Sequence, residues 1–373
     1  MADTSKRYTA AVIGVGRAGP GTYAKGGGHQ IGYTHAQAFG RSPRAALVCG
    51  ADVNRANLDA FNAKFGLAHA GFTDHRAMLR EARPDVVSIG TYVGLHRAMI
   101  EDCARAGVKG ILCEKPFLAS PADVAAVRRV ADETGVRIVV AHIRRYLPAF
   151  ERARDLYTGG AVGEPVLCLA GIGGWDLSEW GSHWLDMFRY FHNDRPVEWV
   201  MGQARVRDTR GYGHAMEEHA VAYFGFRGGG KGLLDGGTGM TANANMTLVG
   251  TAGTIRIYDE RRVEVDTADG RTVEDFGDKP PVGWDRTNVR ADASWWLYPW
   301  DMTVHELVGW MEGGPVPRVG LPTMLETAEL NLAAYLSAVR GDRVDLPLDD
   351  PSTEWPVEVL ARRATARPGG GGA

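Results

Sequence analysis

A glycine-rich turn near the beginning of the chain has the residue types and the spacing that bind a dinucleotide. It ends the apolar run 10–14 and reads Gly14-Val15-Gly16-Arg17-Ala18-Gly19. In the dinucleotide fingerprint the first glycine allows a tight turn, the second lets the pyrophosphate approach the backbone, and the third lets a helix pack closely. We therefore predict that a nucleotide cofactor contacts Gly14, Gly16, Arg17, Ala18 and Gly19. The alternative is a glycine turn that binds no ligand.

An acidic residue, Asp52, directly follows the next apolar run, 45–51. A carboxylate at this place accepts hydrogen bonds from the adenosine ribose and repels a 2′-phosphate, which favours NAD over NADP. Asp52 lies further from the glycine string than the usual ~20 residues, because a Gly-rich insertion, residues 20–33, intervenes. We expect the insertion to form a loop, over the cofactor, toward the substrate or simply in solvent, before a helix resumes near Thr34.

A lysine that could bind a substrate oxygen follows the fourth apolar run of this region. The run 110–113 leads directly into Glu114-Lys115-Pro116. If the runs form a parallel sheet, Lys115 lies at its carboxyl edge, where doubly wound folds bind ligands. The alternative is a solvated charge at the end of a strand.

The elements that must position these residues alternate along the first 141 residues. We expect strands at 10–14, 45–51, 85–91, 110–113 and 137–141, with amphipathic helical patterns between them. Alternation of this kind is typical of a parallel sheet with crossover helices. Ser120 followed by Pro121 marks the beginning of one of the helices.

The pattern changes after Pro148, where one helix leads into many strands in series between about residues 165 and 266. Strands without intervening helices indicate an antiparallel sheet, and two helices follow near 302–312 and 322–340. We therefore expect an α/β fold in which an N-terminal doubly wound Rossmann domain (1–143) precedes an α+β domain (144–365). The second domain has a large, open, mainly antiparallel sheet and binds substrate and other copies of the chain. A disordered tail (366–373) ends the chain.

Composition argues for small-molecule chemistry in the cytoplasm. The formal net charge of −3 over 373 residues gives no attraction to nucleic acid or to anionic lipid. The chain contains neither a signal-peptide pattern nor an apolar run long enough to span a membrane. Its four cysteines lack a C-x-x-C pair, and we expect them to be reduced residues, mostly in the core.

The order of the motifs resembles one oxidoreductase family. The glycine string, the acidic end of the second strand, the segment Thr91-Tyr92-Val93-Gly94-Leu95-His96, Glu114-Lys115-Pro116 and an Arg-x-x-Pro entry to the second domain resemble the glucose–fructose oxidoreductase/inositol dehydrogenase/rhizopine-catabolism (Gfo/Idh/MocA) family. The resemblance covers nearly the whole chain. It implies an NAD(P)-dependent dehydrogenase that acts on CH–OH groups.

The same resemblance implies an active-site motif in which an acidic residue lies four positions before a histidine and an aspartate lies three positions after it. Here these residues are Glu179, His183 and Asp186, with Glu179 where the family usually has Asp. A secondary alcohol loses its hydroxyl proton to a base as hydride leaves the carbon, and histidine suits that role. Lys115 then holds the same oxygen. We therefore expect Lys115, His183 and Glu179 to be catalytic, with a histidine that caps a helix in the core as the alternative for His183.

Further contacts follow from the resemblance. Thr91, His96, Glu114 and Lys115 are expected beside the cofactor, although Tyr92 and Val93 replace the Pro and Asn that the family commonly has. For Thr91 and His96 the alternative is a structural role at the beginning of a helix. The expected substrate-binding residues are aromatic, acidic or basic: Tyr92, Lys115, Arg145, Tyr146, Trp175, Asp176, Trp180, His183 and Asp186.

Two further groups are assigned less closely. The Trp-rich stretch 294–307 lies either at a subunit interface or over the cleft. Trp184 follows His183, and tryptophans in such a stripe are more often part of the core than a platform for a ligand. Glu217, Glu218 and His219 follow a strand pattern, so we expect no metal site there.

Three functions fit these features. The first is an NAD-dependent oxidoreductase that transfers a hydride between a ring secondary hydroxyl of a sugar, sugar derivative or cyclitol and the nicotinamide. The second is a redox-neutral enzyme that retains NAD and uses a transient keto-sugar for elimination, epimerisation or glycoside cleavage. The third is a non-catalytic regulator that senses NAD or a sugar. In each case we expect a homodimer or homotetramer, because the open sheet needs a partner.

Overall fold

The computed structural model describes residues 7–17, 30–67, 71–173, 176–211, 213–237, 246–277 and 297–366. These residues form two compact units. Unit 1 takes its residues from 1–118, 125–143 and 280–324, and unit 2 from 119–124, 144–279 and 325–373. The chain therefore passes between the units more than once, and the division differs from a single boundary after residue 143.

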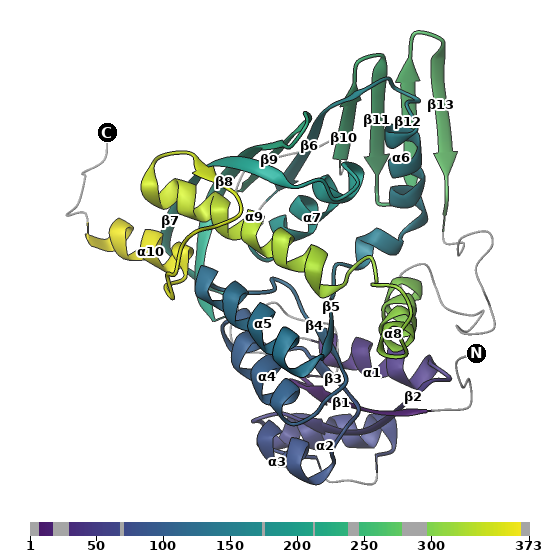
Figure 1. Cartoon of the computed structure of the whole chain (residues 1–373), viewed down its shortest axis with the longest axis vertical. Helices are drawn as coiled ribbons and strands as arrows, with labels where there is room; N and C mark the ends of the chain where they lie inside the picture. Colours follow the sequence, from purple (N-terminus) through teal and green to yellow (C-terminus); the bar gives the residue numbers. More distant parts are fainter. Residues whose placement is uncertain are drawn as a thin grey trace. The chain divides into compact units, whose positions relative to one another are not determined.

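Unit 1 is built on a five-stranded parallel sheet in the order β2-β1-β3-β4-β5 (Figure 1). The strands are β1 (Tyr8–Ile13), β2 (Ala45–Ala51), β3 (Val86–Ile89), β4 (Gly110–Cys113) and β5 (Arg137–Val140). Their apolar side chains are almost entirely buried, which is typical of a parallel sheet covered on both faces. The parallel sheet expected from the alternating pattern is confirmed.

The helices of unit 1 begin and end at recognisable residues. They are α1 (Ile31–Arg41), α2 (Arg55–Phe65), α3 (His75–Glu81), α4 (Val93–Arg105), α5 (Pro121–Thr134, which begins among the residues of unit 2) and α8 (Tyr298–Met311). Asn54 caps α2 by accepting the backbone N–H of Ala56, and Gly66 ends it with a left-handed backbone. Ser120 and Asp123 cap α5 reciprocally through their backbone N–H groups.

Helix α8 belongs to unit 1 although it follows most of unit 2 in the sequence. It contacts α1, β4 and β5. Arg41 on α1 binds Asp301 on α8 through Nε, which lies 2.9 Å from both carboxylate oxygens. The Trp-rich stretch therefore covers α1 within the same unit, as far as its described residues, from 297 on, show.

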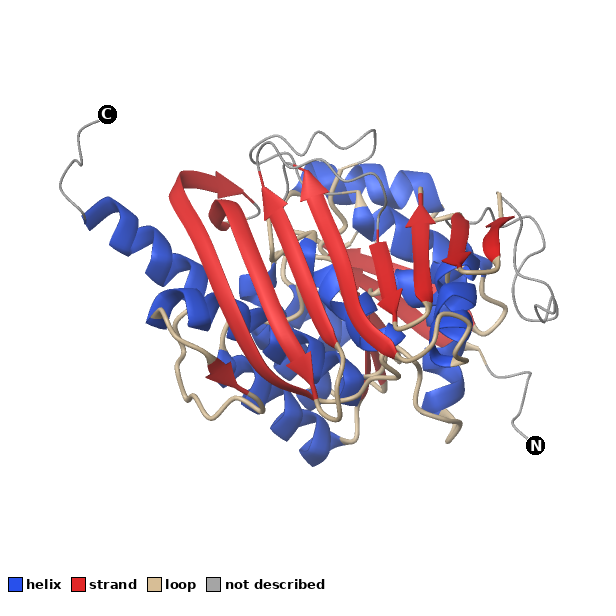
Figure 2. Cartoon of the chain, turned by 90° about the horizontal axis from the view of Figure 1, so that it is seen from above, coloured by secondary structure: helices blue, strands red, loops and turns tan. Residues whose placement is uncertain are grey.

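Unit 2 contains a nine-stranded sheet in the order β13-β12-β11-β10-β6-β9-β8-β7-β14 (Figure 2). All neighbouring strands are antiparallel except β6 and β9. The strands are β6 (Pro165–Gly173), β7 (Val197–Gly211), β8 (His214–Phe226), β9 (Lys231–Gly237), β10 (Met246–Gly250), β11 (Gly253–Tyr258), β12 (Arg262–Thr267), β13 (Gly270–Asp275) and β14 (Val344–Asp345). The large, mainly antiparallel sheet predicted from the sequence is confirmed.

Four helices accompany this sheet: α6 (Pro148–Thr158), α7 (Gly181–Phe191), α9 (Leu321–Arg340, whose first turn is in unit 1) and α10 (Pro356–Ala366). Helix α9 lies directly on β7 at Gly202, where a Cβ would be 2.1 Å from the carbonyl oxygen of Ala334. Gly202 also donates its N–H to Ser337 Oγ, at 2.8 Å. A larger residue at 202 would therefore force the helix away from the sheet.

Some elements differ from the sequence prediction. Helices α3 and α10 are not among the predicted elements, and Ala366, expected in the tail, is the last residue of α10. All four cysteines are buried and free. Within the described residues, no helix combines the length and the apolar character that crossing a membrane requires.

Candidate functional site

The turn after β1 requires glycine for its backbone conformation. Gly14 has φ of +78° and Gly16 has φ of +68°, values that side chains with a Cβ rarely adopt. A Cβ at Gly14 would also lie 2.7 Å from Thr91 Cγ2. The predicted first and second glycines of the fingerprint therefore have the conformation that the motif requires.

The close approach of a helix to this turn occurs at Gly32. A Cβ there would lie 2.6 Å from the carbonyl oxygen of Val15 and 2.7 Å from that of Gly14. Ala18 and Gly19 lie outside the described residues, and α1 begins at Ile31, three residues before the expected Thr34. The packing role expected of Gly19 stays a prediction, and Gly32 lets α1 pack closely against the turn. The only signal for it in the sequence is its place at the end of the insertion.

Asp52 lies at the carboxyl end of β2 and binds the glycine turn. One carboxylate oxygen, Oδ2, accepts the N–H of Gly16 at 3.0 Å, and Oδ1 accepts the N–H of Asn54 at 2.9 Å. Arg17 beside it is exposed. Because an ionised carboxylate has about four acceptor positions, Asp52 can hold the turn and still accept ribose hydroxyls.

Glu114 and Lys115 lie at the carboxyl end of β4, and the Glu114 side chain is held on both oxygens. Its Oε1 lies 3.1 Å from Nε2 of His35, and its Oε2 accepts the N–H of Lys115 at 3.1 Å. His35 on α1 also contacts Ser88 Oγ through Nδ1. Lys115 is half-buried. The sequence prediction did not include His35.

The His96 ring contacts the backbone, and the Thr91 hydroxyl contacts a methionine side chain. The His96 ring is fully buried, with Nδ1 at 3.0 Å from the carbonyl oxygen of Phe117 and Nε2 at 2.9 Å from that of Thr91. The Thr91 hydroxyl lies 3.3 Å from Met99 Sδ. His96 therefore fastens the end of β3 to the chain after Lys115, which favours the structural alternative. Tyr92, before α4, is 41% exposed.

In unit 2, His183 lies in the first turn of α7. The backbone N–H of His183 donates to the carbonyl oxygen of Trp180 at 3.1 Å. The rings of His183 and Trp180 are 6.0 Å apart in an edge-to-face arrangement. The guanidinium of Arg144 lies 5.9 Å from the Trp180 ring and 5.0 Å from the Trp184 ring. Arg144 also binds Glu260 at 2.6 Å. Cation–π contacts and an ion pair thus hold the tryptophans beside His183. Trp175 lies outside the described residues.

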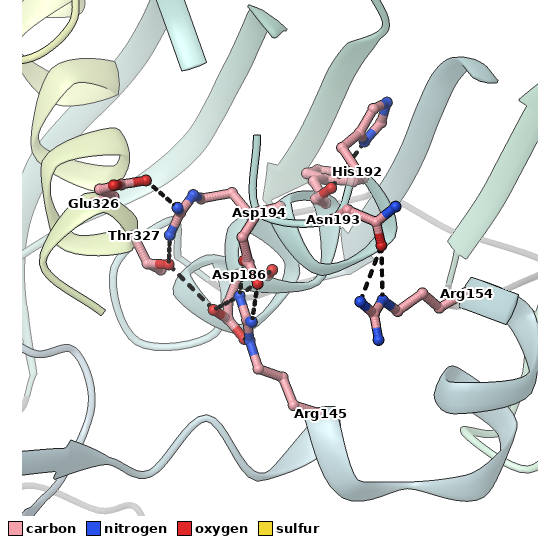
Figure 3. Close-up of polar contacts among 10 residues, drawn as sticks. Arg145, Arg154, Asp186, His192, Asn193, Asp194, Glu326 and Thr327 are labelled. Carbon is pink, nitrogen blue, oxygen red and sulfur yellow. Dashed lines mark hydrogen bonds and ion pairs between the residues drawn. The ribbon is translucent and has the colours of Figure 1, made fainter. Parts of the chain in front are cut away.

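Arg145 forms ion pairs with two carboxylates within unit 2 (Figure 3). It is fully buried and donates to Asp186 through Nε and Nη2, each at 2.8 Å, and to Asp194 at 2.7 and 2.9 Å. Burial alone lowers the pKa of Arg145, but the charges of Asp186 and Asp194 raise it above its usual range. Arg145 therefore has a structural role in unit 2, and its predicted role in binding substrate stays a prediction.

Asp186 belongs to the same buried network (Figure 3). Its Oδ1 also accepts a hydrogen bond from the Thr327 hydroxyl at 3.1 Å. The Thr327 oxygen in turn accepts a hydrogen bond from Nη1 of Arg189 at 2.9 Å. Arg189 in turn binds Glu326. The carboxylate of Asp186 thus joins α7 to α9 and to Arg145, and its predicted contact with substrate stays a prediction. Tyr146, next to Arg145, is fully buried as well.

The segment before α7 is held by a second group of buried polar residues. Asp176 Oδ1 accepts the N–H groups of Glu179 at 2.7 Å and Trp180 at 3.3 Å. Glu179 Oε1 lies 3.2 Å from Nε2 of His214 on β8. The sequence prediction missed His214, whose ring also lies 4.2 Å from that of Trp355.

The backbone of Leu177 is held from both sides. Glu217 on β8 accepts its N–H, and Asn331 on α9 donates to its carbonyl oxygen at 3.0 Å. The Tyr335 hydroxyl donates to Glu217, 3.0 Å from each oxygen. Glu217 is thus part of the protein framework, and among the described residues no group of three His, Cys, Asp or Glu side chains is arranged to hold a metal ion.

Burial shifts the pKa values of three side chains in this cluster. Burial, together with the charges of Glu217 and Glu179, raises the pKa of Asp176 to about 8. Burial also raises the pKa of Glu217. Burial lowers the pKa of His214, but the hydrogen bond and charge of Glu179 and the charge of Asp176 outweigh it and raise that pKa. At neutral pH Asp176 is therefore protonated.

Comparison with known proteins gives the class to which this fold and these motifs belong. Residues 9–142 match the model of an oxidoreductase family with an NAD-binding Rossmann fold, and residues 169–256 match the model of the GFO/IDH/MocA C-terminal domain. The chain therefore belongs to the Gfo/Idh/MocA family of oxidoreductases, and the resemblance stated from the sequence is confirmed.

Individual relatives lie at a moderate distance. A D-apiose dehydrogenase of Paraburkholderia graminis is 26% identical, with 92% of this chain and 91% of the relative covered. An inositol 2-dehydrogenase of Rhizobium meliloti is 27% identical, with 69% and 80% covered. The fold is similar to that of an inositol dehydrogenase homologue from Azotobacter vinelandii, solved with NADH and myo-inositol, at a TM-score of 0.74 and 18% identity, with 91% of this chain and 98% of that chain covered.

The proton on Asp176 predicts a pH dependence of stability. The pKa is about 8 in the fold, above the ordinary value of 3.8, so the contribution to stability is complete below about 3.8 and is lost as the pH rises through 8. The amide of an Asp176→Asn variant resembles the protonated carboxyl and does not titrate. We expect the Tm of the wild type to fall between pH 6 and pH 9 by at least about 2 °C more than that of the variant.

The control is Asp266→Asn. A hydrogen bond from Arg271 lowers the pKa of Asp266, so this group is ionised throughout the range and its variant should follow the wild type. Equal slopes for wild type and Asp176→Asn would mean that Asp176 is already ionised in the folded protein.

Proposed function

We propose that the protein is an NAD-dependent oxidoreductase that transfers a hydride between a ring secondary hydroxyl of a sugar, sugar derivative or cyclitol and the nicotinamide. The observation that carries the proposal lies within unit 1. The turn at Gly14 and Gly16, Asp52, and Glu114 with Lys115 follow the carboxyl ends of β1, β2 and β4. Because the sheet is parallel, these ends share one edge, where doubly wound folds bind ligands.

The described residues fit a dinucleotide. The tight turn with two left-handed glycines lets phosphate oxygens approach the backbone, the beginning of α1 provides backbone N–H groups for them, and Asp52 provides acceptors for ribose hydroxyls. Thr91, His96 and Glu114 are the proposed neighbours of the nicotinamide half, His96 through the backbone that it holds. When bound, the nicotinamide supplies the hydride acceptor or donor of the reaction.

The protein supplies the proton chemistry. We assign Lys115 to hydrogen-bond the reacting hydroxyl oxygen through its ammonium group, which stabilises alkoxide character. We assign His183 to accept the hydroxyl proton. Glu179 supports the segment that leads to His183 through its pairing with His214. The other predicted contacts of the substrate stay predictions: Tyr92, Arg145, Tyr146, Trp175, Asp176, Trp180 and Asp186.

The substrate class rests on the relatives. Those named above are dehydrogenases of a branched sugar and of a cyclitol, and a further relative, from Haloarcula marismortui, is a D-xylose 1-dehydrogenase that uses NADP. A ring polyol is therefore the proposed substrate, and NADP is the competing cofactor. The cytoplasmic location expected from composition stays a prediction.

The choice of cofactor is tested by binding. Because Asp52 places a carboxylate at the end of β2, we expect calorimetry to give an affinity for NAD more than tenfold above that for NADP, about 1.4 kcal/mol or more. An Asp52→Ala variant should reduce this ratio. Arg55, the first residue of α2, is the side chain that could instead accept the phosphate. Equal affinities in the wild type would contradict the assignment.

The roles of Lys115 and His183 are tested by turnover on a polyol panel followed by NADH fluorescence. Lys115→Ala should lower kcat about 100-fold or more and change NAD affinity little, since the glycine turn and Asp52 persist. His183→Ala should lower kcat comparably and recover partly as the pH rises, because more of the substrate is then alkoxide. If both side chains act on one hydroxyl, the double variant is non-additive.

Full turnover in both single variants would contradict the assignment. A wild type that forms no NADH from any polyol, yet cleaves or epimerises a sugar with NAD that copurifies with it, would replace the dehydrogenase with the redox-neutral enzyme. If the protein binds nucleotide and sugar but catalyses neither reaction, the result would support the third function, a non-catalytic regulator.

We also propose that the protein is a homodimer or homotetramer that pairs through the outer face of the unit 2 sheet. Met201, Tyr223, Leu233 and Leu169 lie next to one another across β7, β8, β9 and β6. Helix α9 packs on the face of the sheet at Gly202, and this row lies on the opposite face. Met201 in the row is 52% exposed. A continuous apolar row on an open sheet is typical of an interface.

Light scattering tests the assembly. The wild type should have about two or four times the 40.3 kDa mass of one chain. Leu233→Glu, which places a charge within the apolar row, should lower that mass. The control, Val316→Glu, changes an apolar residue of unit 1 that is 53% exposed and should leave the mass unchanged. A wild-type monomer at micromolar concentration would contradict the proposal.

A further inference from the structure

Unit 1 contains a buried chain of three polar side chains that the proposed function does not yet use. His35 on α1 contacts Ser88 Oγ on β3 through Nδ1, and Glu114 Oε1 after β4 through Nε2, at 3.1 Å. Ser88 and His35 are completely buried, and Glu114 is 6% exposed. Three separate elements therefore meet at one imidazole directly behind Lys115.

The chemistry of the partners fixes the direction of these hydrogen bonds. A carboxylate only accepts, so the pairing with Glu114 requires the proton on Nε2 of His35. In the neutral ring Nδ1 is then an acceptor, and the Ser88 hydroxyl donates to it. Glu114 thus selects the tautomer, and the hydrogen bond from Ser88 supports it.

Glu114 transmits this orientation to the lysine that follows it. Its Oε2 accepts the N–H of Lys115 at 3.1 Å, and its own N–H donates to the carbonyl oxygen of Ile89 at 2.9 Å. With one oxygen on His35 and the other on the Lys115 amide, the carboxylate has a single orientation. The backbone from which the Lys115 side chain extends is therefore tied to α1.

Helix α8 covers the imidazole. The Trp300 ring lies 4.9 Å from the His35 ring, and Trp300 is 3% exposed. Asp301, the next residue, binds Arg41 on α1 at 2.9 Å. The described part of the Trp-rich stretch thus excludes water from the His35–Glu114 pair, which strengthens that hydrogen bond.

We propose that His35 is a positioning residue that orients Glu114 and, through it, Lys115 for the reaction. The inference rests on the proposed function, because it assumes that Lys115 holds the reacting hydroxyl. Without His35, the buried Glu114 Oε1 loses this donor and the carboxylate can turn away from the Lys115 amide. A shift of about 1 Å at a reacting group can lower the rate about 100-fold.

Three variants separate positioning from simple packing. His35→Leu fills the space without a donor, His35→Gln retains an N–H that can reach Glu114, and Ser88→Ala removes the hydroxyl that donates to Nδ1. The control is His75→Gln, which breaks a half-buried pair with Asp102 on the surface of the same unit. Tm and circular dichroism establish that each variant is folded.

Turnover gives the first measurement. We expect His35→Leu to lower kcat about tenfold or more while KM for the best polyol changes less than about threefold, and His35→Gln to recover most of kcat. The control should match the wild type. A purely structural histidine would lower Tm alike in both His35 variants and would leave kcat of the folded protein unchanged, and that result would overturn the proposal.

The nitrogen shifts of the imidazole give a measurement that needs no turnover and no cofactor. In the ¹⁵N-labelled free protein, His35 should be the Nε2–H tautomer, and Ser88→Ala and Glu114→Gln should each shift its nitrogen resonances. If His35→Leu does not fold, Ser88→Ala and His35→Gln still decide the question. If the wild type oxidises no polyol, the proposed function fails, and the tautomer and its response to Glu114→Gln still test His35. The inference would be wrong if the His35 ring had no proton on Nε2, or if Glu114→Gln did not change its nitrogen resonances.

Discussion

The contact between α1 and the turn after β1 leaves no room for a side chain, and the arrangement of unit 1 depends on it. Gly32 lies against the carbonyl oxygens of Gly14 and Val15, and Gly90 lies against the Gly14 carbonyl oxygen on the other side, where a Cβ would be 3.2 Å away. Because α1 is fixed there, His35, one turn further along, can reach Ser88 and Glu114. The same contact therefore fixes the position of the proposed cofactor turn and of the helix whose His35 holds Glu114 beside Lys115.

Unit 2 positions its helix α7 with buried charges. Arg145 joins α7 to the turn after it through Asp186 and Asp194, and Thr327 joins Asp186 to α9. A buried ion pair adds little net stability over an apolar core, but removing one partner costs about 3–5 kcal/mol because the other charge stays buried. The network thus specifies one placement of α7, and with it of His183.

Local patterns were sufficient for much of the fold. Alternating apolar runs predicted the five strands of the parallel sheet, and their ends placed Gly14, Asp52 and Lys115 at one edge. Strands in series predicted the mainly antiparallel sheet. These inferences succeeded because side-chain period and strand order are properties of consecutive residues.

The remaining features depend on residues that are distant in the sequence. Arg145 next to an aromatic residue looked like a contact for substrate, and only the fold brings Asp186 and Asp194 to it. Likewise, His35 meets Glu114 after 79 residues, and Arg41 meets Asp301 after 260. The sequence contains the charges but not their pairing, so neither the ion pairs of Arg145 nor the contact between His35 and Glu114 was predicted.

The two units share one device, a buried glutamate that lies beside a proposed catalytic residue and is paired with a histidine from another element. Glu114 pairs with His35 beside Lys115, and Glu179 pairs with His214 at 3.2 Å in the segment before His183. The second pair gives a physical reason for the glutamate where the family usually has aspartate, since the extra methylene lengthens the reach toward β8. Because His214 is held at Nδ1 by the Ala215 carbonyl oxygen, at 2.7 Å, the ring cannot follow a shorter side chain without losing that bond. An aspartate at 179 would therefore leave His214 without this acceptor.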